Sequence, residues 1–191
     1  MKVNFVTEVS LYTDKADEDG EPSPLFQEIL GSIVSVDPET DKSIKIGTVS
    51  ATLFNYFRSQ ELALSMFYEA DKQNPEFAGF IATIEGSKDI FLGSVLLIQK
   101  IQIRPKYRGK GIGNAVITRA VDIFLKGEGH VFLEPFPLDQ SGKGDTKKLR
   151  SGRKTLTEYY AKMGFAQFEH SAYMFFDASL RQPCMLLERY L

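Results

Sequence analysis

A glycine-rich turn in the middle of the chain is the part of the sequence best suited to chemistry. It reads Arg108-Gly109-Lys110-Gly111-Ile112-Gly113 and leads into a segment whose apolar residues recur at helical spacing. Glycine lets the backbone adopt positive φ and approach a ligand closely. The first amides of a helix have no partner within the helix and carry partial positive charge. With the cations of Arg108 and Lys110, these amides, up to that of Asn114, predict a binding site for a diphosphate.

Two other glycine-loop motifs fit the sequence less well. A Walker A loop needs Gly-Lys followed by Ser or Thr, but Asn114 follows Gly113 and Gly144 follows Lys143. A dinucleotide-binding fingerprint needs G-x-G-x-x-G directly after a strand, whereas the glycines here alternate. Glu134 does lie about 20 residues further on, where a ribose-binding acid would fall. A dinucleotide-binding enzyme therefore stays open as an alternative, as does a helix start that needs glycine only for packing.

The elements around this turn predict one α+β domain. Strands are expected at Val3–Tyr12, Leu25–Val36, Ile44–Tyr56, Ile90–Ile103, His130–Glu134, Phe165–Phe176 and Met185–Leu191. Helices are expected from Ser59 to Lys72, from Pro75 to Gly86, over Val116–Phe124 with a stop at Gly127, and from Thr155 to Gly164. Three strands thus precede any helix, and residues 135–154 are predicted to form a polar insertion. The continuous apolar run from Val95 to Ile98 predicts a strand that is covered on both faces.

Composition limits the classes of function. The 191 residues suit a single domain, with a net charge of -2 that gives no overall attraction to nucleic acid or anionic lipid. The single Cys184 allows no internal disulfide, and His130 and His170 have no cysteine cluster for a zinc site, so no metal is expected. We find no signal peptide and no run of apolar residues that could span a membrane. We therefore expect a cytoplasmic protein.

Two motifs in order resemble those of the GNAT N-acetyltransferases. Arg108-x-x-Gly111-x-Gly113 matches the family's Q/R-x-x-G-x-G/A motif, and the preceding residues 101–107 match its apolar-x-apolar-x-Pro-x-Tyr lead-in. Residues 160–165, Tyr-Ala-Lys-Met-Gly-Phe, match the Y-x-K-x-G-F motif at its expected place. The match covers roughly Val95 to Phe165, and the first third of the chain carries no recognised motif.

The resemblance implies a GNAT-like acyl-CoA N-acyltransferase fold. Its mixed central sheet would have about seven strands, flanking helices and a splay between the fourth and fifth strands. Residues 1–191 would form one domain, with a variable N-terminal part at 1–89, an acetyl-CoA-binding core at 90–165 and C-terminal strands at 166–191. Acetyl-CoA would serve as the acetyl donor, held at the glycine-rich turn from Arg108 to Asn114.

The resemblance also assigns roles to residues beside the turn. The main chain of Ile101 and Ile103 would bond the pantetheine, and the Ile101 N–H would polarise the thioester carbonyl. Tyr160 would protonate the departing thiolate, and the capping box that we expect at Thr155 and Glu158 would fix the start of its helix. Tyr159 is the neighbour most easily confused with Tyr160. Packing in the core is an alternative role for Tyr160.

The general base is not defined by the sequence. Some family members carry a glutamate where this chain has Leu97. Glu134 is our candidate base, Gln99 could order a water, and an amine that arrives deprotonated would need no base. Arg153 stands where many members have an asparagine that contacts pantetheine, and it could instead reach a phosphate.

The insertion at 135–154 leaves its own alternatives open. Its six cationic and two acidic side chains give it a formal charge of +4. It could bind the 3′-phosphate of coenzyme A or an acidic acceptor, or it could be a solvated loop.

These features predict an N-acetyltransferase that moves acetyl to a primary amine by direct transfer in a ternary complex. A non-catalytic coenzyme-A-binding module of the same fold is the alternative. The acceptor is not identified: small amines, antibiotics, peptide N-termini, lysine side chains and aminoacyl-tRNA all stay open. Apart from such a tRNA we expect no nucleic-acid partner and no membrane, and a homodimer is compatible with the sequence.

Overall fold

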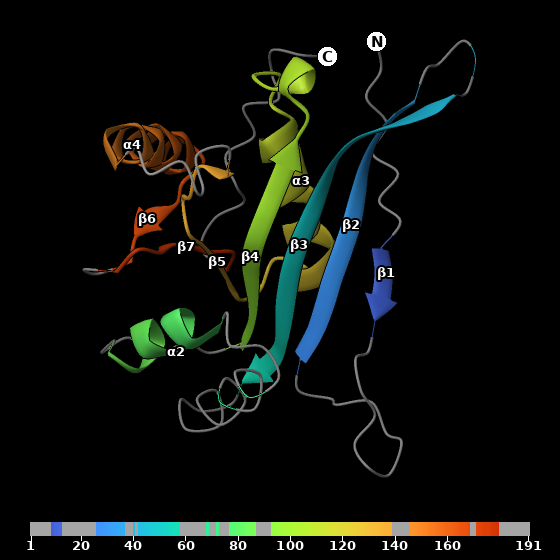
Figure 1. Cartoon of the computed structure of the whole chain (residues 1–191). Coiled ribbons are helices and arrows are strands. Elements are labelled where there is room, and N and C mark those ends of the chain that lie inside the picture. Colours follow the sequence, from blue (N-terminus) through green and yellow to red (C-terminus); the bar gives the residue numbers. More distant parts are fainter. Residues whose placement is uncertain are drawn as a thin grey trace.

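A single mixed sheet organises the part of the chain that the structure describes. The computed structural model describes residues 9–12, 26–36, 40, 42–57, 68, 72, 77–86, 93–138, 146–168 and 171–179. The strands are β1 Val9–Tyr12, β2 Phe26–Val36, β3 Ser43–Phe57, β4 Gly93–Ile103, β5 His130–Leu133, β6 Ala166–Gln167 and β7 Met174–Asp177. They pair in the order β1-β2-β3-β4-β5-β7-β6 (Figure 1). Only the β4–β5 pair is parallel among these strands, and the expected α+β class with a mixed seven-stranded sheet is confirmed.

Helices cover both faces of this sheet. Helix α2, Ala78–Glu85, packs on one face, and α3, Ile112–Ala120, packs on the other, behind β3 and β4 in Figure 1. A π-helical turn, η3 Val121–Leu125, continues α3 and ends at Lys126 and Gly127, both with positive φ, so the predicted stop at Gly127 is confirmed. The end of α4, Thr146–Lys162, packs on the same face as α3. No helix among the described residues is long and apolar enough to cross a membrane.

Strand β4 is buried on both faces, as its apolar run predicted. Val95 and Leu97 pack with the aromatic cluster beneath α2, whereas Leu96 and Ile98 pack with the cluster beneath α3. All four side chains are at most 4% exposed. The alternation follows from the two-residue period of a strand. Because β4 is locked in this way over its first half, its second half has a defined direction beyond the core.

Helix α4 begins earlier than the sequence predicted. It starts at Thr146, so the predicted polar insertion at 135–154 is wrong in its second half, and no capping box forms at Thr155. The Thr155 hydroxyl instead donates to the Ser151 carbonyl inside the helix, at 3.1 Å. The run of Lys and Arg that suggested a loop consists of good helix formers on the exposed face of an amphipathic helix.

The C-terminal strand prediction was too long. The expected strand Phe165–Phe176 is two short strands, β6 and β7, separated by a turn in which the Phe168 N–H donates to the Tyr173 carbonyl at 3.0 Å. The Ser171 hydroxyl stabilises this turn by donating to the Phe168 carbonyl at 2.7 Å. The predicted strand Met185–Leu191 lies outside the described residues. So does the predicted helix 59–72, apart from Tyr68 and Lys72, which are helical.

The start of the β4–β5 pair depends on one glycine. A side chain at Gly129 would place its Cβ 2.2 Å from the Ser94 carbonyl oxygen, and the φ of Gly129 is +103°. Any other residue would therefore meet both a main-chain clash and backbone strain. The close approach sets the register in which β4 and β5 begin.

We expect Gly129→Ala to lower the free energy of unfolding by about 2–4 kcal/mol, because the backbone of Ser94 has to move. Gly127→Ala is the matched control: Gly127 has φ +84° but open space around its Cβ position, so only the left-handed strain of about 1–2 kcal/mol applies. Urea unfolding of both variants measures the difference. Equal losses in the two variants would contradict this account of the strand register.

Candidate functional site

The two central parallel strands separate beyond their first four paired residues. β4 and β5 pair from Val95↔His130 to Ile98↔Leu133, where β5 ends, whereas β4 continues to Ile103. On its other side β4 stays paired with β3 up to Gly47↔Ile103. Among the residues that the structure describes, the end of β4 therefore has a neighbouring strand on one edge only, and this is the splay that the family resemblance implied.

A bulge in β4 marks the point of separation. The register with β3 passes from Ala51↔Ile98 to Ser50↔Lys100, so Gln99 has no opposite residue. Its side-chain oxygen accepts hydrogen bonds from the hydroxyls of Ser50 (3.2 Å) and Thr52 (3.3 Å). A bulge bends its strand and increases the local twist. The sequence suggested that Gln99 could order a water. Its side-chain carbonyl oxygen instead accepts hydrogen bonds that stabilise the bend.

The main-chain groups of Ile101 and Ile103 point into the splay. The Arg104 N–H donates to the Ile46 carbonyl at 2.8 Å, which makes these two residues a hydrogen-bonded pair. Hydrogen-bonded and non-hydrogen-bonded pairs alternate in antiparallel strands, so Ile103↔Gly47 and Ile101↔Val49 are of the second kind. Their N–H and C=O groups face away from β3. The Ile103 carbonyl accepts a hydrogen bond from Arg108 Nε at 2.8 Å. The Ile101 N–H also lies on this open side of the strand.

The glycine-rich turn joins the end of β4 to α3. After a short 3-10 helix, Pro105–Tyr107, Gly109 and Gly111 adopt φ of +72° and +73°, and no atom lies within 4 Å of the Cβ position of either. Gly111 caps α3, and the first bond within the helix runs from the Ala115 N–H to the Gly111 carbonyl. The four preceding amides, from Gly111 to Asn114, thus lack partners within the helix.

Positive charge surrounds these amides. The ammonium groups of Lys106 and Lys110 lie 4.8 and 5.9 Å from the centroid of the Tyr107 ring, and the side chain of Arg108 is exposed. The arrangement is a positively charged turn that is open to solvent at the start of a helix, which is the geometry expected of an anion-binding nest.

Asn114 is turned away from the exposed turn. Its side chain is 6% exposed and accepts a hydrogen bond from the Thr118 hydroxyl at 3.4 Å. Its main-chain N–H donates to the hydroxyl of Tyr159 on α4. The sequence did not reveal this contact, because nothing in the spacing of residues 114 and 159 links the two helices.

Tyr160 lies on the inner side of α4 and packs, like Ile101, against the core cluster beneath α3. Its ring centroid is 5.2 Å from that of Tyr159 and 5.9 Å from that of Phe165. Burial raises the pKa of Tyr160 to about 12, and the neighbouring Tyr159 adds to the shift. Its hydroxyl is therefore neutral at physiological pH and has a proton to donate.

The residues after Tyr160 explain the Y-x-K-x-G-F pattern in physical terms. The Tyr160 carbonyl accepts from the N–H groups of Met163 (2.9 Å) and Phe165 (3.2 Å), and Gly164 adopts φ +98° to make this helix end possible. Phe165 then packs against Tyr160. The motif fixes where α4 ends and so fixes the position of the tyrosine.

A separate polar group lies at the end of β5. Glu134 directly follows β5 and forms an ion pair with Arg153 of α4, whose guanidinium also lies 5.9 Å from the Phe136 ring centroid. Burial, with the charge of Glu134 as the smaller cause, raises the pKa of Tyr173 to about 12, so this tyrosine lies near the pair. Tyr173 was missed because no sequence signal connects the β6–β7 turn with the end of β5.

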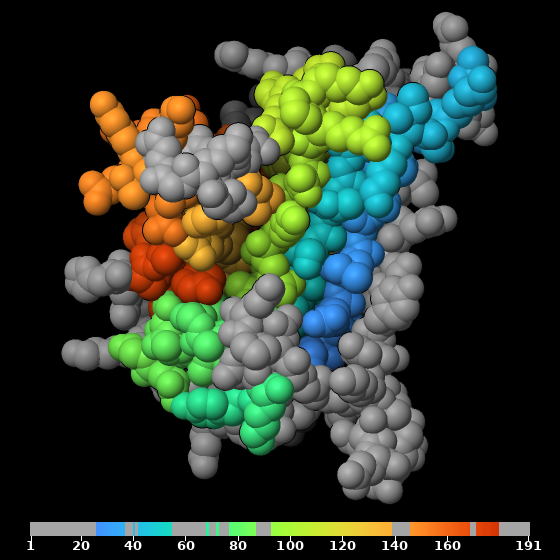
Figure 2. Space-filling model, in the orientation of Figure 1, coloured from blue at the N-terminus to red at the C-terminus, as the bar shows by residue number. Residues whose placement is uncertain are grey.

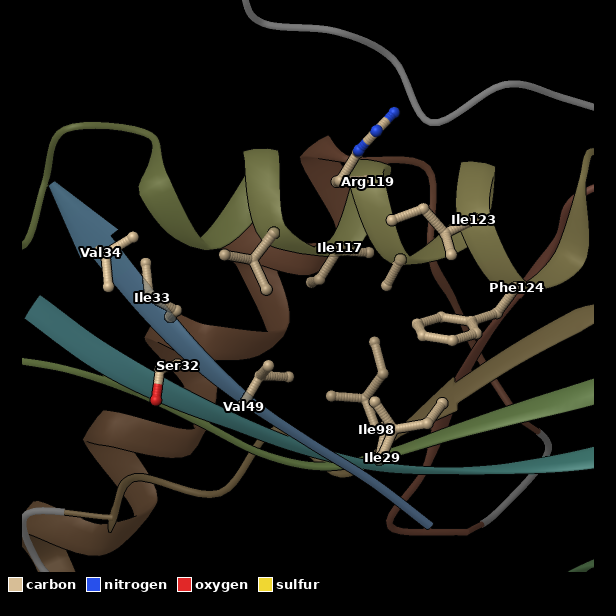
Figure 3. Close-up of a pocket in the computed structure, with 13 residues that line it drawn as sticks. Ile29, Ser32, Ile33, Val34, Val49, Ile98, Ile117, Arg119, Ile123 and Phe124 are labelled. Carbon is tan, nitrogen blue, oxygen red and sulfur yellow. The ribbon is translucent and has the colours of Figure 1, made fainter. Parts of the chain in front are cut away.

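An apolar pocket lies elsewhere, between α3 with η3 and the strands β2 and β3 (Figure 3). It is lined mainly by aliphatic and aromatic side chains such as Ile33, Val49 and Phe124, and Arg119 points away from it. Ile98 of β4 also lines it, and its polar lining residues are Ser32 and Arg119. The pocket is therefore mainly apolar, unlike the positively charged glycine-rich turn.

Comparison with known proteins gives a family match. A model described as the acetyltransferase (GNAT) family matches residues 33–141, which is more than half of the chain. A search of curated proteins finds no match.

Solved structures with a related arrangement are distant. They include the KacTA-DNA complex, with 12% identity and a TM-score of 0.45 over 83% of this chain and 71% of that one. AtaTR bound with acetyl-CoA has 12% identity and a TM-score of 0.43 over 80% and 72%. A tyrosine-to-phenylalanine mutant of the AtaT toxin, bound to the C-terminus of the antitoxin AtaR and acetyl-CoA, has 11% identity and a TM-score of 0.43 over 91% and 94%.

We expect Gly111→Ala to weaken binding of coenzyme A by about tenfold or more. Alanine at φ +73° costs about 1–2 kcal/mol, and its methyl group would enter the open space above the amides. Isothermal titration calorimetry measures the change. Gly127→Ala introduces the same backbone strain away from the turn and should leave the Kd for coenzyme A within twofold. A similar loss of affinity in this control would show that the turn is not part of the binding site.

Proposed function

Because the chain belongs to the GNAT family of acetyltransferases, we propose that it moves the acetyl group of acetyl-CoA directly to a primary amine while both substrates are bound. The observation that carries this proposal is the continuity of the splay with the turn. β4 turns its Ile101 N–H into the gap, and the chain that follows β4 leads through a short 3-10 helix to the amides of residues 109–113. An elongated donor with a diphosphate at one end and a thioester at the other fits this arrangement.

The proposed donor site uses the main chain rather than dedicated side chains. The amides of the turn and of the start of α3 hold the diphosphate, with Arg108 and Lys110 adding charge. The pantetheine runs along the free edge of β4, where the N–H groups of Ile101 and Ile103 face the gap. Arg108 ties the Ile103 carbonyl to the turn at 2.8 Å, so the two halves of the site keep a fixed relation.

The proposed transfer is a direct displacement. The amine nitrogen attacks the thioester carbon, and the carbonyl oxygen gains negative charge that the Ile101 N–H stabilises. The C–S bond breaks, the electron pair leaves with sulfur, and the Tyr160 hydroxyl donates its proton to the thiolate. The attacking nitrogen loses one proton in exchange, so charge and atoms balance.

The high pKa of Tyr160 shapes this step. A phenol with a pKa of about 12 is a weaker acid than an ordinary thiol. We therefore expect Tyr160 to act first as a hydrogen-bond donor to the sulfur as charge develops there. The proton moves from the Tyr160 hydroxyl to the sulfur as the C–S bond breaks. Tyr160 is then reprotonated by a proton that originates from the amine.

Glu134 remains our candidate for the group that accepts the proton of the amine, directly or through water. Its ion pair with Arg153 and its closeness to Tyr173 keep the carboxylate at the end of β5, beside the splay. Arg153 is then better assigned to orienting Glu134 than to contacting pantetheine or a phosphate. An amine that arrives deprotonated would still need no base.

The outer face of α4 favours an acidic acceptor. Among the side chains of α4 that face solvent are five cations and one acid: Lys147, Lys148, Arg150, Lys154, Lys162 and Glu158. In Figure 2 the orange segment that contains α4 lies in the upper left of the view, beside the yellow-green end of β4, and some of its atoms project from the molecule. A polyamine would be repelled there, whereas an amine carried on an acidic molecule, such as aminoacyl-tRNA, would be attracted.

Initial-rate kinetics test the proposed function. Acetyl-CoA is incubated with a panel of amines (an aminoglycoside, a polyamine, a lysine peptide and an aminoacyl-tRNA), and the free thiol is followed with a thiol reagent. We expect thiol release that depends on the amine, and double-reciprocal lines that intersect. Parallel lines would indicate a covalent acetyl-enzyme and would overturn direct transfer.

Tyr160→Phe should lower kcat by about 100-fold or more and change the KM for acetyl-CoA by less than threefold, because only the proton donor is lost. The wild-type pH profile is a companion measurement. Since the hydroxyl keeps its proton until the pH approaches 12, kcat should not decline between about pH 8 and about pH 10.5. Unchanged turnover in the variant would exclude Tyr160 as the acid.

A further inference from the structure

The start of α3 lacks a cap of its own. Gly111 at the capping position has no side chain, and the first turn of the helix contains no acidic residue. Four amides therefore need partners from elsewhere. An Asp or Glu cap would satisfy them, but its negative charge would repel a diphosphate from the same amides.

A tyrosine of another helix supplies part of this cap. The Tyr159 hydroxyl accepts a hydrogen bond from the Asn114 N–H, the innermost of the four amides. The hydroxyl oxygen also lies 3.2 Å from the position that a Cβ on Gly113 would occupy. The absence of a side chain at Gly113 thus makes room for the phenol beside the amides of the turn.

The chemistry of a phenol suits this place. Burial raises the pKa of Tyr159, against the smaller opposing effect of the Asn114 amide, so the group stays neutral. A hydroxyl that accepts one hydrogen bond still has its own proton to donate. A donor that is already polarised by an amide binds an anion more strongly, because linked hydrogen bonds reinforce one another.

We propose that Tyr159 is a donor-binding residue: its hydroxyl accepts the Asn114 N–H and donates its proton to the diphosphate held by the amides of residues 111–113. This inference rests on the proposed function, in that it takes coenzyme A as the ligand of the turn. It also changes the part of Asn114, whose amide acts through Tyr159 and not on the phosphate itself. Tyr159 and Tyr160 thereby divide two tasks between neighbouring positions of α4, binding the carrier and protonating its sulfur.

Tyr159→Phe removes the hydroxyl and keeps the ring contact with Tyr160. We expect the Kd of coenzyme A, measured by calorimetry, to rise about tenfold, as for loss of a hydrogen bond to a charged group. Pantetheine lacks the diphosphate, so its inhibition constant against acetyl-CoA should change by less than twofold. Tyr68→Phe removes an exposed hydroxyl that bonds Glu85 and should leave both constants unchanged.

Amide hydrogen exchange of the ligand-free protein provides a second measurement that is independent of binding. The Asn114 amide should be protected in the wild type and exchange faster in Tyr159→Phe, while the amide of Ala115 keeps its protection. A coenzyme A affinity within twofold of wild type would overturn the inference. So would equal weakening of coenzyme A and pantetheine, because that pattern indicates a general packing defect. If the wild type itself does not bind coenzyme A, the proposed function fails, and this inference fails with it.

Discussion

The structure depends on a strand that loses one neighbour halfway along its length. Up to Ile98, β4 has a hydrogen-bonding partner on both edges, and beyond it only β3 remains among the described strands. Main-chain polar groups need partners, and those of Ile101 face a gap instead of a strand. The bulge at Gln99, held by two hydroxyls of β3, makes this separation a built feature rather than a frayed end. A ligand that can hydrogen-bond like a strand is the natural complement of such an edge.

The local features of the site could be predicted from the sequence, because they depend on neighbouring residues. Alternating glycines followed by a helical apolar pattern indicated the turn and α3, and the run from Val95 to Ile98 indicated a strand covered on both faces. The position of Tyr160 followed from the residues that end its helix. Each of these signals is local, and each element has the predicted type.

The remaining features depend on contacts between distant residues, which one sequence does not display. The bulge at Gln99 requires Ser50 and Thr52 of a strand about 50 residues earlier. The contacts from Asn114 to Tyr159 and from Glu134 to Arg153 join elements whose relative position is set by packing. The early start of α4 was missed for another reason: a row of cations resembles a loop in composition, although it is also the solvent face of a helix.

Because the net charge of the chain is -2, the proposed binding of an anion has to depend on a local arrangement of charges and dipoles. Main-chain amides suit this purpose because they carry no counter-charge and, in the turn, need no side chain to hold them. A neutral phenol extends the same principle: burial keeps both Tyr159 and Tyr160 protonated, so in the proposed roles each would donate a hydrogen bond without adding charge. In the proposed function, the lysines and arginines around the turn attract coenzyme A from solution, while amides and hydroxyls fix its position. Attraction from solution and positioning in the site would thus depend on different groups. A higher salt concentration should weaken the attraction by lysines and arginines far more than the hydrogen bonds from amides and hydroxyls.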